Sequence, residues 1–287
     1  MRRSRSVRAA ALLALGVGAL ALGVTACGGD DEPQSLGFEL TSADGKFAIS
    51  EPTPVEAGLV RFEYQNSTEE QADAQLLRID DGHSLEDALA VLNDDTTPDW
   101  LHAAGGVGQI AAGATGEAEL LLEEGTYYLV DVGEPEGDDV PSHAESGATA
   151  MIEVAEGDDD AALPDVDASI EMDEYSFLVD GLKAGANRFR LSNTGEQIHH
   201  TLVVPIAEGK TIGDVREFIA SEGQPSGPPP IDFSKLTGTS ALDGGGEQIA
   251  ELTLDAGRYA FLCFIPDREG GPPHVLKGML REVTIGE

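Results

Sequence analysis

From residue 35 onward, short runs of alternating apolar and polar residues are broken at regular intervals by Gly, Pro, Asn and Asp. Such alternation is typical of strands with one buried face, and its regular interruption favours a β-sandwich. A stretch at 211–221 has helical spacing behind a Thr N-cap, and the Pro- and Gly-rich residues 223–239 are typical of a loop. In the C-terminal half the pattern predicts strands at 169–177, 187–191, 199–205, 248–254, 258–265 and 278–285.

The same pattern occurs twice. A strand with its turn, a capped helix, a pair of strands and a histidine followed by glycine recur in the same order at a nearly constant offset. They lie at 57–70 and 184–197, 84–89 and 211–216, 119–128 and 251–260, and at His143 with Gly147 and His274 with Gly278. This repetition predicts a duplicated all-β domain with one short helix in each copy. We place the copies at 35–155 and 168–287, joined by an acidic linker at 156–167, and expect a long loop at 94–106.

The N-terminus has the features of an export signal. An apolar run at 9–24 is too short and too often interrupted by Gly for a good membrane span. The small residues before Cys27 resemble a bacterial lipobox, in which the cysteine is acylated and becomes the new N-terminus. We therefore predict a signal peptide at 1–26, a lipid on Cys27 and a polar tether at 27–34, which places the protein on the outer face of the cytoplasmic membrane. An ordinary cleaved signal with a chance cysteine is the alternative. Four arginines precede the apolar run: Arg2, Arg3, Arg5 and Arg8.

The chain is strongly acidic, with 17 Lys and Arg against 53 Asp and Glu and a formal net charge of −36. An acidic surface repels nucleic acid and anionic lipid headgroups, so the composition excludes a nucleic-acid-binding protein. It would also steer a basic partner, such as a redox protein, at low salt. Solubility, in a salty habitat for example, is the simpler explanation of the charge.

Cys263 needs an explanation, because the chain has two cysteines and the lipid would occupy Cys27. In an oxidising compartment cysteines usually pair in disulfides, so a lone thiol is either inert and buried or bound to something. Period-two alternation puts Tyr259, Phe261 and Cys263 on one face of a strand. His274 follows this strand, and Met279 lies five residues after His274.

These residues resemble the copper-ligand pattern of the cupredoxins, such as plastocyanin and azurin. The resemblance covers most of 168–287 and implies a Greek-key β-sandwich with a copper ion at one end. It implies Cys263 and His274 as equatorial ligands and Met279 as the axial ligand. His199, which follows an Asn-x-Gly turn, would be the third equatorial ligand.

The donor set agrees with the resemblance, because a thiolate, two imidazoles and a thioether suit both Cu(I) and Cu(II). His200 is the alternative to His199, since alternation fixes only that neighbouring residues face opposite sides. The loop between Cys263 and His274 has ten residues, more than in those proteins. A Cu(I) store and a degenerate remnant are therefore alternatives to a blue-copper site.

The first copy lacks this donor set. Asp131 stands at the position of Cys263, and Ala148 at that of Met279. Ala72 and Asp73 stand at the positions of His199 and His200, which leaves His143 alone. We expect this copy to bind no copper and to act as a spacer or docking domain. The histidines outside the site, His83, His102 and His143, are expected to be solvated loop residues.

The sequence favours a lipid-anchored copper protein that carries electrons or handles copper, and not an enzyme. A copper oxidase would need further histidines beside Cys263, where Leu262 and Phe264 stand. No Gly-x-Ser-x-Gly, His-Glu-x-x-His or phosphate-loop motif is present. The alternative is a metal-free pair of β-sandwiches that serves in binding or envelope assembly.

Overall fold

The computed structural model describes residues 32–92, 94–133, 140–158, 160–221 and 227–286. The predicted signal peptide, the lipidation site Cys27 and most of the tether lie outside these residues. Residues 32–287 form one compact unit. In the described ranges, we find no helix with the length and apolar character needed to cross a bilayer.

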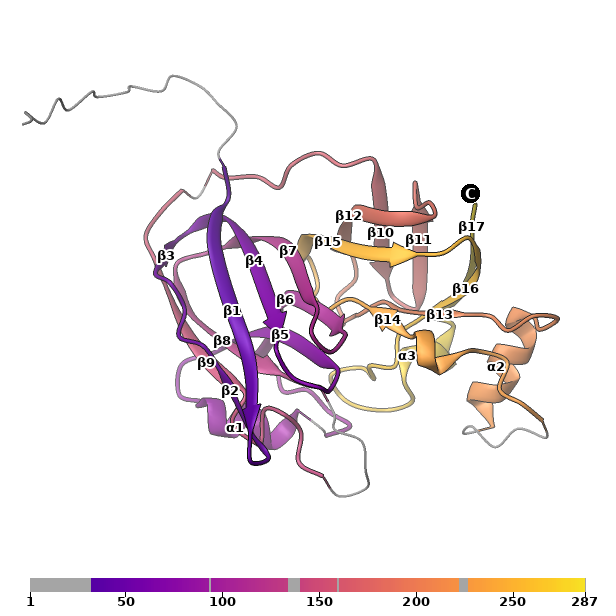
Figure 1. Cartoon of the computed structure of the whole chain (residues 1–287), viewed down its shortest axis with the longest axis horizontal. Helices are drawn as coiled ribbons and strands as arrows, with labels where there is room; N and C mark the ends of the chain where they lie inside the picture. The colour runs from indigo at the N-terminus through magenta and orange to yellow at the C-terminus, as the bar shows by residue number, and fades with distance from the viewer. Residues whose placement is uncertain (1–31, 93, 134–139, 159, 222–226, 287) are drawn as a thin grey trace, which may run out of the picture. The chain divides into compact units, whose positions relative to one another are not determined.

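Strands make up most of the chain, with a few short helices between them (Figure 1). The first half contains β1 (Gln34–Ala43), β2 (Lys46–Ile49), β3 (Val55–Glu56), β4 (Gly58–Asn66), β5 (Ala72–Ile79), α1 (Leu85–Val91), β6 (Leu101–Ile110), β7 (Thr115–Leu122), β8 (Gly125–Asp131) and β9 (Thr149–Ala155). The second half contains β10 (Ala168–Asp173), β11 (Ser176–Asp180), β12 (Gly185–Asn193), β13 (Leu202–Pro205), α2 (Ile212–Ala220), a 3₁₀ turn (Phe233–Lys235), β14 (Thr237–Gly238), β15 (Glu247–Leu254), β16 (Gly257–Leu262), α3 (His274–Lys277) and β17 (Leu280–Ile285).

The strands form two sandwiches that share one sheet. The shared sheet has eight strands in the order β11-β10-β12-β15-β7-β4-β1-β2. The β3-β9-β8-β5-β6 sheet covers the part formed by β7, β4, β1 and β2, and the β14-β13-β16-β17 sheet covers the part formed by β11, β10, β12 and β15. The two halves meet where β7 pairs with β15, with Ala118 opposite Ala250 and Leu120 opposite Gln248. One ladder of backbone hydrogen bonds therefore joins the two sandwiches.

The two sandwiches repeat each other element by element. β1 runs parallel to β4 and β10 runs parallel to β12, which are the equivalent pairs. α1 and α2 begin with the same capping box, in which Ser84 or Thr211 exchanges hydrogen bonds with an Asp three residues later. The prediction of an all-β fold with two sandwiches and few short helices is confirmed. The second sandwich differs in having the extra one-turn helix α3.

Several sequence predictions about local structure were wrong, and two of the differences are the largest. Residues 169–177 are not one strand, because the chain turns between β10 and β11 at Tyr175, which has a φ of 61°. Residues 101–106 are not loop but the start of β6, which pairs with β5 across a bulge. Gly106 makes the bulge possible: its φ is 132°, and a Cβ there would lie 2.1 Å from the Ala74 carbonyl oxygen.

Candidate metal centre

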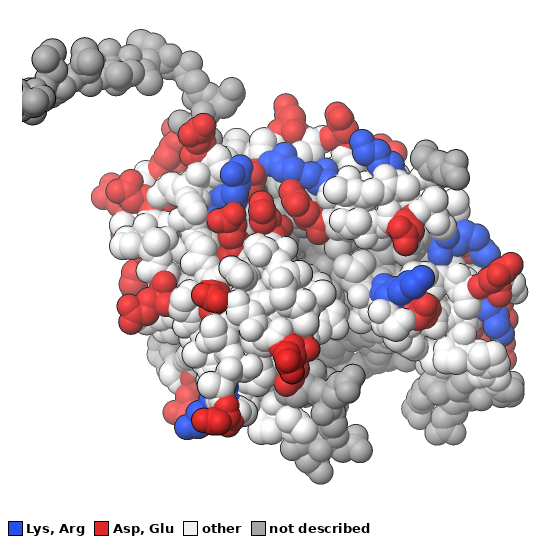
Figure 2. Space-filling view, in the orientation of Figure 1, with Lys and Arg blue, Asp and Glu red and all other residues white. Residues whose placement is uncertain are grey.

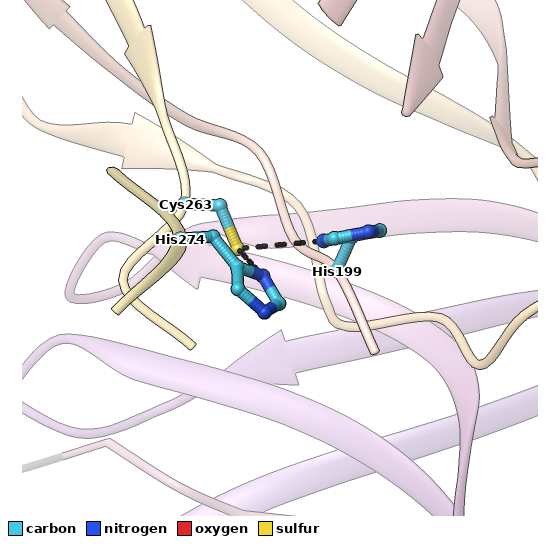
Figure 3. Close-up of side chains that lie close together, drawn as sticks. All are labelled: His199, Cys263 and His274. Atoms are coloured by element: carbon cyan, nitrogen blue, oxygen red, sulfur yellow. Dashed lines mark hydrogen bonds between the residues drawn. The ribbon is translucent and has the colours of Figure 1, made fainter. Parts of the chain in front are cut away.

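Three buried donors from separate elements meet at one end of the second sandwich (Figure 3). Cys263 follows the last residue of β16, His274 opens α3, and His199 precedes β13. All three residues are fully buried. The Cys263 Sγ lies 3.6 Å from Nδ1 of His274 and 4.0 Å from Nδ1 of His199. Both rings therefore turn the same nitrogen toward the sulfur.

The spacing of these atoms fits a single metal ion. A metal such as zinc binds a thiolate at about 2.3 Å and an imidazole nitrogen at about 2.0 Å. With bond angles between tetrahedral and trigonal, the sulfur and nitrogen then lie about 3.5 to 3.7 Å apart. The observed distances of 3.6 and 4.0 Å are close to this range.

His199 lies beside the Cys263 sulfur, whereas the next residue, His200, contacts the backbone of Phe264. β13 begins at Leu202, and His199 lies before it in an isolated bridge with Leu242. His200 points the other way, and its Nε2 accepts a hydrogen bond of 3.1 Å from the N–H of Phe264. The His200 side chain therefore supports the backbone next to Cys263, and its ring is not one of the candidate metal ligands.

Met279 lies in the same buried core as Cys263. α3 ends at Gly278, which has a φ of 122°, and the Met279 N–H then donates to the His274 carbonyl oxygen at 2.9 Å. This turn brings the chain back toward the start of α3 within five residues. Met279 itself is fully buried, so its thioether lies away from solvent within the core that includes Cys263.

Burial of the Cys263 sulfur disfavours the thiolate, and backbone amides offset part of this effect. Burial raises the pKa of Cys263 to about 12, whereas hydrogen bonds from the backbone N–H groups of His200 and Ile265 lower it. The first sandwich has the same arrangement around Asp131, whose carboxylate accepts from the N–H groups of Asp73 and Gly133 at 3.2 and 2.9 Å. Both copies thus surround an acidic side chain with donors. A thiolate this deeply buried needs a nearby cation, which a bound metal would supply.

The ring of His274 is held by the insertion between the two ligands. Its Nε2 lies 3.0 Å from Oδ1 of Asp267, which also accepts from the Tyr175 hydroxyl at 2.9 Å and forms an ion pair with Lys277. A carboxylate at Nε2 fixes the ring proton there and leaves the Nδ1 lone pair free to face Cys263. The long loop therefore contributes a residue that orients a ligand.

His199 is held in its neutral form with no partner at its outer nitrogen. Burial, followed by the neighbouring His274, lowers the pKa of His199 to about 4. Its Nε2 is buried without a hydrogen-bond partner among the described residues. Its Nδ1 lies 4.0 Å from the sulfur of Cys263. A metal ion on Nδ1 would therefore bind a neutral ring on the side that faces this sulfur.

The donor types identify the metal. Two imidazoles and a thiolate with a buried methionine nearby are the set that selects copper, because thiolate and thioether are soft ligands. The second sandwich carries a cupredoxin-like copper site. The cluster is typical of a type 1 centre, in which the protein accommodates both Cu(I) and Cu(II).

No protein-family model matches the chain, and no curated protein is similar to it in sequence. Solved structures with a similar fold include the reduced auracyanin of Roseiflexus castenholzii, 22% identical, covering 42% of this chain and 95% of that one with a TM-score of 0.27. The copper nitrite reductase of Nitrosomonas europaea is 13% identical and covers 88% and 94% of the two chains, with a TM-score of 0.27. A multicopper oxidase is 15% identical and covers 88% of each, with a TM-score of 0.24. It is the donor set, and not these overall similarities, that identifies the centre.

The equivalent position in the first sandwich holds an ion pair. His143 is fully buried, with Nδ1 3.0 Å from Asp131 and Nε2 3.2 Å from Glu70. Two carboxylates accept from the two ring nitrogens, so the geometry favours the doubly protonated cation. The Tyr64 hydroxyl donates to the other Asp131 oxygen at 2.8 Å. The first copy thus pairs Asp131 with a histidine cation at the position where the second copy places its thiolate and metal.

The expectation that three histidines are solvated loop residues was wrong for two of them. His143 is buried because its partners Asp131 and Glu70 close over both nitrogens. His102 lies in β6 between the carboxylates of Asp80 and Asp243. His83 does lie in an exposed loop, where its ring stacks on Trp100. In retrospect, the equivalence of His143 with His274 was the sequence signal that pointed to its burial.

The His143 pair predicts a stability that falls as the pH rises above about 6.5. Burial lowers the pKa of His143, but its hydrogen bonds and charge pairing with Asp131 and Glu70 outweigh burial and raise the pKa above 6.5. The stabilisation is then complete below the unfolded-state pKa and is lost as the pH rises through the folded-state value. We expect the free energy of unfolding in urea to fall by up to about 1.4 kcal/mol per pH unit in that window. His143→Gln should remove this slope, and an unchanged slope would contradict the assignment.

Proposed function

We propose that this protein is a copper-binding electron carrier of the cell envelope, attached to the membrane by a lipid on Cys27. The observation that supports it is the closed cluster of His199, Cys263 and His274, in which both rings present Nδ1 to a sulfur surrounded by backbone donors. Bound copper would supply a one-electron couple at this point.

The chain's own residues favour electron transfer over copper delivery. The ligands are fully buried, and Asp267 covers the outer nitrogen of His274 with help from Tyr175 and Lys277. A buried and hydrogen-bonded ligand set needs little rearrangement when the oxidation state changes. An exchangeable store would instead need at least one ligand that opens readily to solvent. Copper handling is therefore the second candidate.

The surface suggests the kind of partner. Acidic side chains spread over the face shown in Figure 2, with fewer basic ones among them. The chain has a net charge of −36, which would attract a basic protein over a long range. We therefore propose a basic redox protein as the partner. We propose a carrier and not an enzyme because Leu262 and Phe264, which flank Cys263, offer no ligand to a second copper centre.

A copper titration of residues 32–287, which form one compact unit, tests the proposal. We expect one Cu(II) per chain and an intense thiolate-to-copper absorption at about 600 nm, with the matching EPR signal, that disappears reversibly on reduction. Tight binding of Cu(I) without a coloured Cu(II) form would favour copper storage. A folded protein that binds neither state would refute the proposal and leave a metal-free β-sandwich module.

A further inference from the structure

The insertion between Cys263 and His274 reaches across to the first sandwich. At its centre, the Arg268 guanidinium donates to the carbonyl oxygens of Pro98 and Leu101 at 2.9 and 3.0 Å. The Arg268 carbonyl accepts from the Thr97 N–H at 3.0 Å. A Cβ on Gly270 would lie 3.1 Å from the Asp95 carbonyl oxygen. The segment before β6 thus contacts the ligand loop along several residues.

The charge of Arg268 is balanced at the same place. Its Nη2 forms an ion pair with Asp243, whose other oxygen lies 3.0 Å from Nδ1 of His102 on β6. The Asp243 N–H donates to the Ala103 carbonyl oxygen at 2.9 Å. Arg268 is only 16% exposed and Asp243 22% exposed. A guanidinium that satisfies two carbonyls and a carboxylate in a mostly buried place fixes both position and orientation.

We propose that Arg268 is a positioning residue for the copper site and that the first sandwich is the support on which it fixes the ligand loop. This inference rests on the proposed function, because it assigns the first sandwich a role at that same site. It explains why a copy without copper ligands accompanies the one that has them. The first sandwich supplies a rigid surface for a loop too long to hold itself.

Arg268 is connected through neighbouring residues to the two histidines of the candidate metal site. Asp267, the residue before Arg268, holds Nε2 of His274. The Arg268 N–H donates to Oε1 of Gln197, two residues before His199, at 2.8 Å. Arg268 therefore connects the first sandwich to the segments that carry both histidine ligands. Loss of the anchor should loosen Asp267 and with it the orientation of the His274 ring.

The test compares two arginines that each bridge the sandwiches. Arg268→Ala removes the anchor of the ligand loop. Arg188→Ala is the matched control, because Arg188 on β12 forms an ion pair with Glu119 on β7, away from the loop. Arg268→Lys keeps the charge but lacks the planar fork that places one nitrogen at the two carbonyls and the other at the carboxylate. Each variant is made in residues 32–287.

The first measurement needs no metal. The His274 N–H donates to the Ile265 carbonyl and the Val275 N–H to the Cys263 carbonyl, so hydrogen exchange of these two amides reports whether the loop is held. In Arg268→Ala we expect both to exchange at least about tenfold faster, while the amides of β12 stay protected. Arg188→Ala should leave them unchanged, and Arg268→Lys should resemble Arg268→Ala.

The second measurement is copper affinity. We expect Arg268→Ala to weaken copper binding by about tenfold or more, the range for lost outer contacts of a metal site, and to alter the EPR spectrum. Equal behaviour of Arg268→Ala and Arg188→Ala in both measurements would overturn the inference. If the unmodified chain binds no copper but its loop amides still respond selectively to Arg268, the proposed function fails while the support of the loop by the first sandwich stands.

Discussion

Cys263→Ser is expected to abolish the absorption at about 600 nm of the copper-loaded protein. The band arises from charge transfer from a thiolate to copper, and a serine hydroxyl is a hard, neutral donor that cannot replace it. We also expect copper affinity to fall by more than about a hundredfold, since loss of an outer contact alone costs up to that factor. Visible absorption and equilibrium copper binding measure the two effects.

The variant should remain folded. The first sandwich has Asp131 at the equivalent position, fully buried, so this place in the fold accepts a polar oxygen side chain when backbone amides surround it. Met172→Leu is the matched control: Met172 is a buried thioether of the same core whose sulfur accepts from the Thr201 hydroxyl at 3.3 Å. Its variant should keep the colour. Colour that survives in Cys263→Ser would show that copper binds elsewhere.

The three residues that the structure brings together, His199, Cys263 and His274, were named from a resemblance to the cupredoxins that rests on local pattern. Alternation along β16 and the spacing from His274 to Met279 are visible in the sequence without long-range information. The choice between His199 and His200 was not predictable in this way. It depends on His199 pairing with Leu242, more than forty residues away along the chain, before β13 begins.

The features that join the two sandwiches were also invisible in the sequence. The pairing of β7 with β15 brings together strands from different copies. The alternation of apolar and polar residues in either strand does not indicate which strand it pairs with. Arg268 lies in the loop between Cys263 and His274, and its side chain is mostly buried against the first sandwich. Contacts between distant segments depend on the assembled fold, which single-sequence patterns do not encode.

The two copies differ in the cation that is available to an equivalent acidic side chain. Each sandwich points the same two backbone N–H groups at an acidic side chain, Asp131 in one and Cys263 in the other. In the first copy the cation that balances the charge is His143, held by a second carboxylate. In the second copy both histidines have lowered pKa values because of burial, so neither serves as that cation near neutral pH. A thiolate at Cys263 would therefore need a cation from outside the chain, which a bound metal would supply.

Copper is therefore expected to stabilise the fold strongly. A ligand that binds only the folded state adds about 4 kcal/mol at a thousandfold excess over its dissociation constant. For a chain of this size that corresponds to a rise of about 8 to 16 °C in the midpoint of thermal unfolding. The unfolded chain should bind poorly, because His199 and Cys263 are separated by 64 residues. Differential scanning calorimetry with and without one equivalent of copper measures the shift.

The control for this shift is Cys263→Ser, which should unfold at the same temperature with and without copper. The many surface carboxylates could bind copper weakly, but weak sites give little stabilisation at one equivalent of metal. An equal shift in the unmodified chain and in Cys263→Ser would place the stabilising copper outside the cluster. A shift confined to the unmodified chain would show that the stabilisation comes from copper bound at Cys263.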